Sequence, residues 1–121
     1  MVHFADEQAP AEAVIAVASI RAAGGEELVR GVVGAFNDFA AAQAAWLDRQ
    51  VASLDFGSVA EGARALRVSA AQLGVLDVVK ACERAELAGD GEDAVAIEAA
   101  VDAVHDALAA ARPWMDALAA G

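Results

Sequence analysis

Large apolar residues recur at helical spacing throughout positions 26–54, and this pattern limits the fold more than any other feature. The steps between them are built from three and four residues, so one face of a long helix is continuously apolar. A helix with such a face needs other helices to cover it. The residues of this face are Leu28, Val32, Phe36, Phe39, Leu47, Val51 and Leu54.

Composition favours helix in the rest of the chain as well. Of the 121 residues, 59 % are hydrophobic and 35 are alanine, the best helix former. There are two prolines, no tyrosine and no threonine, a composition that disfavours a sheet protein. The 36 larger apolar residues suffice for one core but not for two. We therefore expect a single all-α domain over residues 1–121.

Helix-breaking residues divide the chain into five segments. The breaks fall at Gly24-Gly25, Asp55-Phe56-Gly57, Gly74 and Gly89-Asp90-Gly91. They predict helices over 10–22, 26–54, 58–73, 75–88 and 91–111, with Pro10 in the first turn of the first helix. Short connections between amphipathic helices favour an antiparallel four-helix bundle, with the short N-terminal helix laid against it and a core over about 10–111.

Capping residues and apolar stripes refine two of these helices. Ser58 and Glu61 have the spacing of a capping box, and Asp90 is the predicted N-cap of the fifth helix. Pro113 should end or kink that helix, leaving a short final turn. The turn holds Trp114, Met115 and Leu118; the predicted inward stripes are Val59, Ala63, Leu66, Ala70 and Leu73 in the third helix and Val95, Ala99, Val101, Val104 and Leu108 in the fifth.

Charge and cysteine content exclude several classes of function. The net charge of −11 disfavours binding to nucleic acid and to anionic membrane surfaces, because both require Lys and Arg. Cys82 is the only cysteine, so it forms neither an internal disulfide nor a metal cluster, which is typical of a cytoplasmic protein. Residues 1–8 lack a signal-peptide pattern, and no stretch has the length of a membrane span. We expect no cofactor and no metal.

One segment resembles a known family. Residues 64–74 read Arg-Ala-Leu-Arg-Val-Ser-Ala-Ala-Gln-Leu-Gly. This run is similar to the signature of histidine-containing phosphotransfer (HPt) domains, which is usually His-x-Leu-Lys-Gly-Ser-(Ser/Ala)-x-x-(Leu/Ile)-Gly. The segments Gly24–Leu28 and Cys82–Asp90 agree with the family's flanking helices, so the resemblance extends over roughly 14–110. It implies bacterial-type two-component phosphorelay signalling, with a response-regulator receiver domain or a sensor histidine kinase as partner.

The chain departs from this signature at the two positions that serve phosphotransfer. The resemblance places the phosphoacceptor histidine at Arg64, whose protonated guanidinium has no free lone pair to attack an acyl phosphate. The family's glycine four residues later is Val68 here, whereas Ser69 and Gly74 are kept. The resemblance thus implies a degenerate member that is not an enzyme and that docks partners without carrying phosphate, as an adaptor or inhibitor.

Basic residues gather near the same place. Arg64, Arg67, Lys80 and Arg84 give segment 64–84 a net charge of +2, against −13 for the rest of the chain. Receiver domains, the partners implied by the resemblance, present an acidic pocket that Arg64 could reach as a bidentate donor. The simpler interpretation is local pairing, for example of Lys80 with Asp77. The predicted receiver-binding residues are Ala60, Arg64, Arg67, Val68, Ala71, Lys80 and Arg84.

Other polar and aromatic residues favour structural roles. His105 lies near Asp102 and Asp106 and is expected to be a surface histidine, as is His3 at the terminus. The acidic row of Glu98, Asp102 and Asp106 is typical of a solvated helix face. Ser69 has no base partner in the sequence, and Gly24-Gly25-Glu26 is too short for a phosphate loop. The aromatic residues Trp46 and Trp114 are predicted core or edge anchors, although Trp114 and Met115 could also form a homodimer patch.

Two alternatives of different classes stay open. The chain could be an active phosphotransfer protein that uses a noncanonical residue such as His105. It could also be a structural or oligomerising bundle in which alanine-rich stripes pack between subunits.

Overall fold

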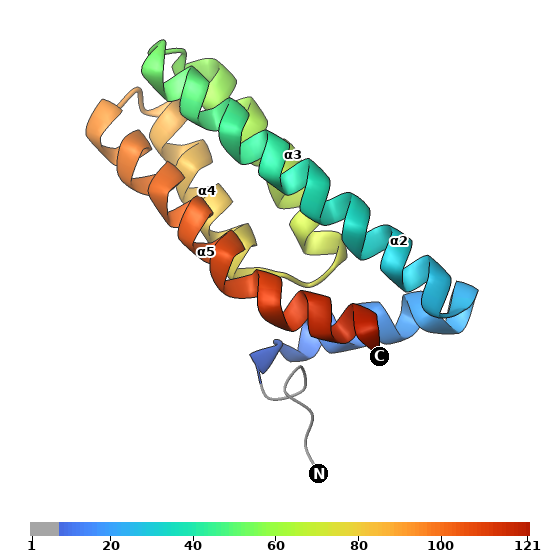
Figure 1. The fold of residues 1–121 in the computed structure, drawn as a ribbon. Coiled ribbons are helices and arrows are strands. Elements are labelled where there is room, and N and C mark those ends of the chain that lie inside the picture. Colours follow the sequence, from blue (N-terminus) through green and yellow to red (C-terminus); the bar gives the residue numbers. More distant parts are fainter. Residues whose placement is uncertain (1–7) are drawn as a thin grey trace.

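The computed structural model describes residues 8–121, which form four helices in an antiparallel bundle (Figure 1). The helices are α2 (Ala11–Ala52), α3 (Phe56–Gln72), α4 (Leu76–Asp90) and α5 (Ala94–Ala120). Along the ring of the bundle, α2 packs against α3 and α5, and α4 packs against α3 and α5. The prediction of an all-α four-helix bundle is confirmed.

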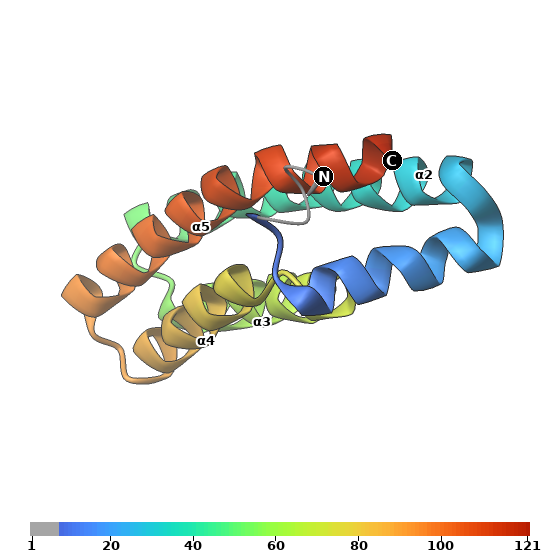
Figure 2. The same ribbon diagram turned by 90° about the horizontal axis from the view of Figure 1, so that it is seen from below.

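The predicted short N-terminal helix is the part of α2 that precedes Gly25, which we call the first limb of α2. At Gly25 the backbone leaves the helical region, with φ 77° and ψ −169°, a conformation that is essentially limited to glycine. The chain reverses there, so the first limb runs back along the bundle, as Figure 2 shows. The predicted break between the first two helices is therefore present, although the helical ladder continues on both sides of it.

Two contacts fasten this first limb to the rest of the molecule. Its inward residues Ala13 and Val17 are buried. Arg21 pairs with Glu26 across the reversal and donates a hydrogen bond from Nη2 to the carbonyl oxygen of Leu118, at 2.8 Å. The limb therefore closes one end of the bundle and holds the last turn of α5.

The buried face of α2 differs from the predicted one. Its inward residues are Val29, Val33, Phe36, Ala40, Ala44 and Leu47, which follow each other at steps of three and four. Leu28, Phe39 and Leu54 are exposed instead. The face is rotated because alanines at positions 40 and 44 take core places and let the neighbouring helices approach closely. In α5 the same correction applies: Val95 is 81 % exposed and Ala99 is exposed, whereas Ile97 and Ala100 are buried.

The helix caps are aspartates upstream or downstream of the predicted positions. Asp55 caps α3: it accepts a hydrogen bond from the backbone N–H of Ser58 at 3.2 Å and another from the Ser58 hydroxyl at 2.8 Å. Asp93, not Asp90, caps α5 by accepting from the backbone N–H of Ala96. The predicted Ser58 capping box was therefore wrong by three residues. In both helices the acceptor lies three residues before the donor, as N-cap geometry requires.

Pro113 lies inside α5, and the helix continues beyond it to Ala120. Proline removes one backbone donor, so the carbonyl of Ala109 loses its helical partner. Because both Pro113 and Ala109 are exposed, water can satisfy that carbonyl. Figure 1 shows α5 changing direction toward its C-terminal end. The continued helix buries Met115 and Leu118 in the core. Of the two outcomes expected at Pro113, α5 therefore shows the bend (Figure 1) and not the end of the helix.

None of the helices in residues 8–121 combines the length and the apolar character needed to cross a membrane.

Candidate docking surface

Four of the predicted receiver-binding residues lie together on α3 and form what we call the docking strip: Arg64, Arg67, Val68 and Ala71. Arg64 and Val68 lie one turn apart, with 55 % of the Arg64 side chain and 48 % of Val68 exposed, and Ala71 continues the face. Arg67 is half-buried at its edge. Ala60 was wrongly included, because it is buried against α4, where a side-chain carbon at Gly89 would touch it. The strip therefore begins at Arg64.

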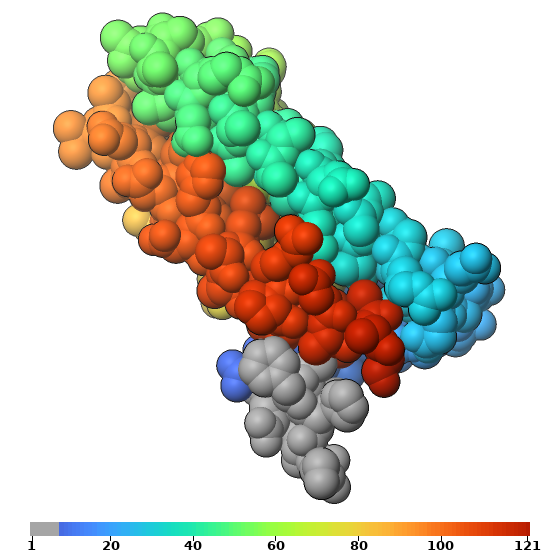
Figure 3. Space-filling view, in the orientation of Figure 1, coloured from blue at the N-terminus to red at the C-terminus, as the bar shows by residue number. Residues whose placement is uncertain are grey.

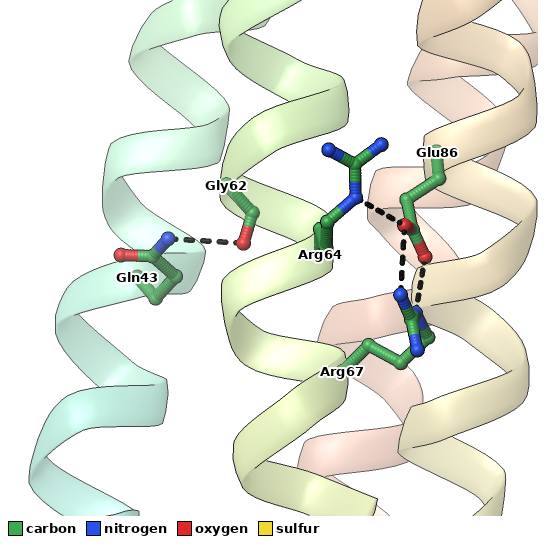
Figure 4. Close-up of polar contacts among 5 residues, drawn as sticks. All are labelled: Gln43, Gly62, Arg64, Arg67 and Glu86. Carbon is green, nitrogen blue, oxygen red and sulfur yellow. Dashed lines mark hydrogen bonds and ion pairs between the residues drawn. The ribbon is translucent and has the colours of Figure 1, made fainter.

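Glu86 on α4 binds both arginines of the strip (Figure 4). Arg67 donates from Nε to Oε2 of Glu86 at 2.6 Å and from Nη2 to Oε1 at 3.3 Å. Arg64 donates only from Nε, to Oε1, at 3.2 Å. The Glu86 side chain is 12 % exposed, so this carboxylate is held in place between the two helices. Both arginines of α3 are therefore paired, but with an acid of the neighbouring helix and not with a local acid on their own helix.

The electrostatic surroundings of Arg67 are acidic. The hydrogen bonding of Arg67 to the Glu86 carboxylate and then the charge of Glu86 raise the pKa of the Arg67 guanidinium, and the charge of Glu83 raises it further. The adjacent thiol of Cys82 is fully buried, and that burial raises its pKa to about 12, so it stays protonated at neutral pH.

The four cations of the segment do not form one cluster. Arg84 lines a groove between α4 and α5 together with Leu87 and Asp93. Lys80 lies one turn before Arg84, and Glu86 lies about 200° around the helix from Arg84. Lys80 and Arg84 therefore occupy a different side of α4 from the strip, and within residues 8–121 Lys80 forms no ion pair with Asp77.

An apolar groove lies between α2 and the C-terminal end of α3. Its volume is about 590 Å³. Phe39 on α2 is partly exposed there, and Ser69 and Gln72 of α3 form its polar edge. Gln72 lies one turn after Val68 on α3, so the groove adjoins the strip and extends its apolar part. The remaining lining residues are Ile20, Val32, Ala35, Phe36 and Leu73.

His105 lies on α5 and contacts α2, two helices that run side by side (Figure 3), so it belongs to a different face from the strip. Its Nε2 is 2.9 and 3.0 Å from the two carboxylate oxygens of Asp48 on α2. It borders a shallow groove of about 370 Å³ that alanines of both helices line. The sequence pointed to Asp102 and Asp106 as its acidic neighbours, but the contact is to the other helix.

The remaining candidates have structural positions. Glu98, Asp102 and Asp106 are all exposed, as a solvated face requires. Met115 is buried and Trp114 half-buried, so the predicted dimer patch at these two residues was wrong. His3 lies outside the described residues. In the part of the chain that is described, no three His, Cys, Asp or Glu side chains come together to hold a metal.

Trp46 covers the backbone of α3 at Gly62, where an added side-chain carbon would lie 2.3 Å from the Trp46 ring. Gln43 donates a hydrogen bond to the Gly62 carbonyl at 3.0 Å, on the opposite side of α3 from Glu86 (Figure 4). Helix α3 is thus held from both sides.

Comparison with family models, with curated proteins and with solved structures found no match to this chain.

Proposed function

We propose that this chain is a docking module of two-component signalling that binds a receiver domain, or a sensor histidine kinase, without carrying phosphate. The observation that carries the proposal is the exposure of Arg64 and Val68 side by side on α3. At both of these positions, which the resemblance associates with phosphotransfer, the HPt-like run departs from its signature. A cytoplasmic location and a bacterial-type pathway belong to the same proposal.

The chemistry at position 64 supports docking over transfer. A phosphoacceptor needs an unprotonated nitrogen, and the guanidinium of Arg64 offers only donors. The same group is well suited to an acidic partner surface, since it forms short, directional hydrogen bonds with carboxylates. Val68, Ala71 and the adjoining groove supply the apolar centre that a protein interface needs beside such a charge.

The alternative of transfer through His105 has less support. His105 lies on α5, diagonally across the bundle from α3, and its Nε2 is turned toward Asp48. The alternative of an oligomerising bundle rests on alanine-rich faces alone, such as the groove between α2 and α5.

The binding experiment measures the affinity of the purified chain for a panel of receiver domains. We expect Arg64→Glu and Val68→Asp each to weaken the binding of any receiver that the wild type captures by about tenfold or more, as for residues central to an interface. Arg30→Glu is the matched control, because it makes the same charge change at an exposed position on α2 and should change the affinity by less than about threefold. Equal affinity of wild type and Arg64→Glu would contradict the proposal.

A further inference from the structure

The guanidinium of Arg64 has one occupied edge and one open edge. Its Nε is bound to Glu86, and within residues 8–121 its two terminal nitrogens have no hydrogen-bond partner. Figure 4 shows these nitrogens pointing away from the Glu86 carboxylate. The open edge presents two parallel N–H groups, a geometry that matches the two oxygens of a carboxylate.

Arg67, Glu86 and Arg64 form a row of alternating positive and negative charges that ends at Arg64. Arg67 binds Glu86 through two nitrogens, and Glu86 in turn binds Arg64. The three groups together retain one positive charge, and Arg64 is the terminal and most exposed of them. A further anion bound at Arg64 would neutralise this remaining positive charge.

Glu86 is a firm support for Arg64. Arg67 binds both carboxylate oxygens of Glu86, and the Glu86 side chain is largely buried. The carboxylate therefore cannot move away without losing three hydrogen bonds. A long arginine side chain loses much rotamer freedom when it binds a ligand. Fixing Nε before the partner arrives removes part of that cost.

We infer that Glu86 is a positioning residue, and that the open edge of Arg64 which it holds is a binding site for a carboxylate on the surface of the docking partner. The identity of the partner rests on the proposed function, whereas the anion site does not. Removing the negative charge of Glu86 next to the site should therefore weaken the binding of an anion.

Nuclear magnetic resonance of the arginine Nε–Hε groups tests the site directly, with sodium acetate as the probe at constant ionic strength. We expect acetate to shift the Arg64 signal, and Glu86→Gln to raise the half-saturating acetate concentration by about threefold to fivefold, since Arg64 loses its support. Glu83→Gln is the matched control, because Glu83 lies on the same helix and is exposed. It should leave that concentration unchanged or lower it.

The opposite ranking would overturn the inference. If Glu86→Gln binds acetate as tightly as Glu83→Gln or more tightly, Glu86 only repels anions and positions nothing. An Arg64 signal that acetate does not move, while the signal of exposed Arg30 responds, would exclude the site itself.

A receiver that binds the wild type allows a second readout. In an Arg64→Ala background, Glu86→Gln should weaken the binding of that receiver less than it does in the wild type, because the part of its effect that Arg64 transmits is gone. An undiminished effect of Glu86→Gln in that background would also contradict the inference. If no receiver binds, the proposed function fails while the acetate result stands; if acetate binding fails while receivers bind, the reverse holds.

Discussion

Replacing Leu66 by alanine is expected to lower the free energy of unfolding by about 3 kcal/mol, within the range for leucine deletions in a closed core. Leu66 is fully buried on the inward face of α3, in the same cluster as Phe36, Val104 and Met115. The truncation leaves a cavity that rigid helices on several sides cannot fill by collapse. Chemical denaturation followed by circular dichroism measures the change.

Leu87→Ala is the control for this substitution. Leu87 is 73 % exposed on α4, so the same chemical change should alter the free energy of unfolding by less than about 0.5 kcal/mol. Similar losses for the two variants would mean that Leu66 is not at the centre of the core.

Gly74→Ala is expected to destabilise the protein by about 2 to 4 kcal/mol, for two independent reasons. Gly74 has φ 68°, in the left-handed region where a side chain is strained. A side-chain carbon there would also lie 2.5 Å from the backbone of Glu12 and Ala13, which cannot move without displacing the first limb of α2. Thermal and denaturant unfolding measure the loss.

Gly34→Ala provides the opposite result with the same chemical change. Gly34 lies in the interior of α2, and an added carbon there meets no atom within 4 Å. Alanine should therefore stabilise the protein by about 0.5 to 1 kcal/mol, through its higher helix propensity. A Gly74→Ala variant as stable as wild type would show that the turn between α3 and α4 does not press against the first limb.

The sequence predicts helices, breaks and bundle architecture well, because these depend on local periodicity and on glycine. It predicts the inward faces less well. Ala40 and Ala44 occupy core positions in α2, and apolar size alone favours exposed Leu28 and Phe39 over them. Which alanines are buried depends on how closely two helices approach, and that is a property of the packed structure.

In the candidate site, too, some features follow from the sequence and others depend on how the helices pack. The exposure of Arg64 and Val68 follows from helical spacing, and the sequence places both correctly on one face of α3. The role of Glu86 does not follow, because its partners are about twenty residues away along the chain and meet it only when α3 and α4 pack together. The separation of Arg84 from the strip likewise depends on the rotation of α4 against α5. A count of acids on the neighbouring helix could have pointed to Glu86.

Phosphoryl transfer from a phosphorylated receiver domain, measured as label on this chain, tests the proposal most directly when the receiver is one that the wild type binds. We expect a stable complex and no label on the wild type, whereas the Arg64→His, Val68→Gly double variant gains a phosphoacceptor and becomes labelled. Stable label on the wild type that disappears in His105→Ala would contradict docking without transfer. It would establish His105 as a phosphoacceptor instead.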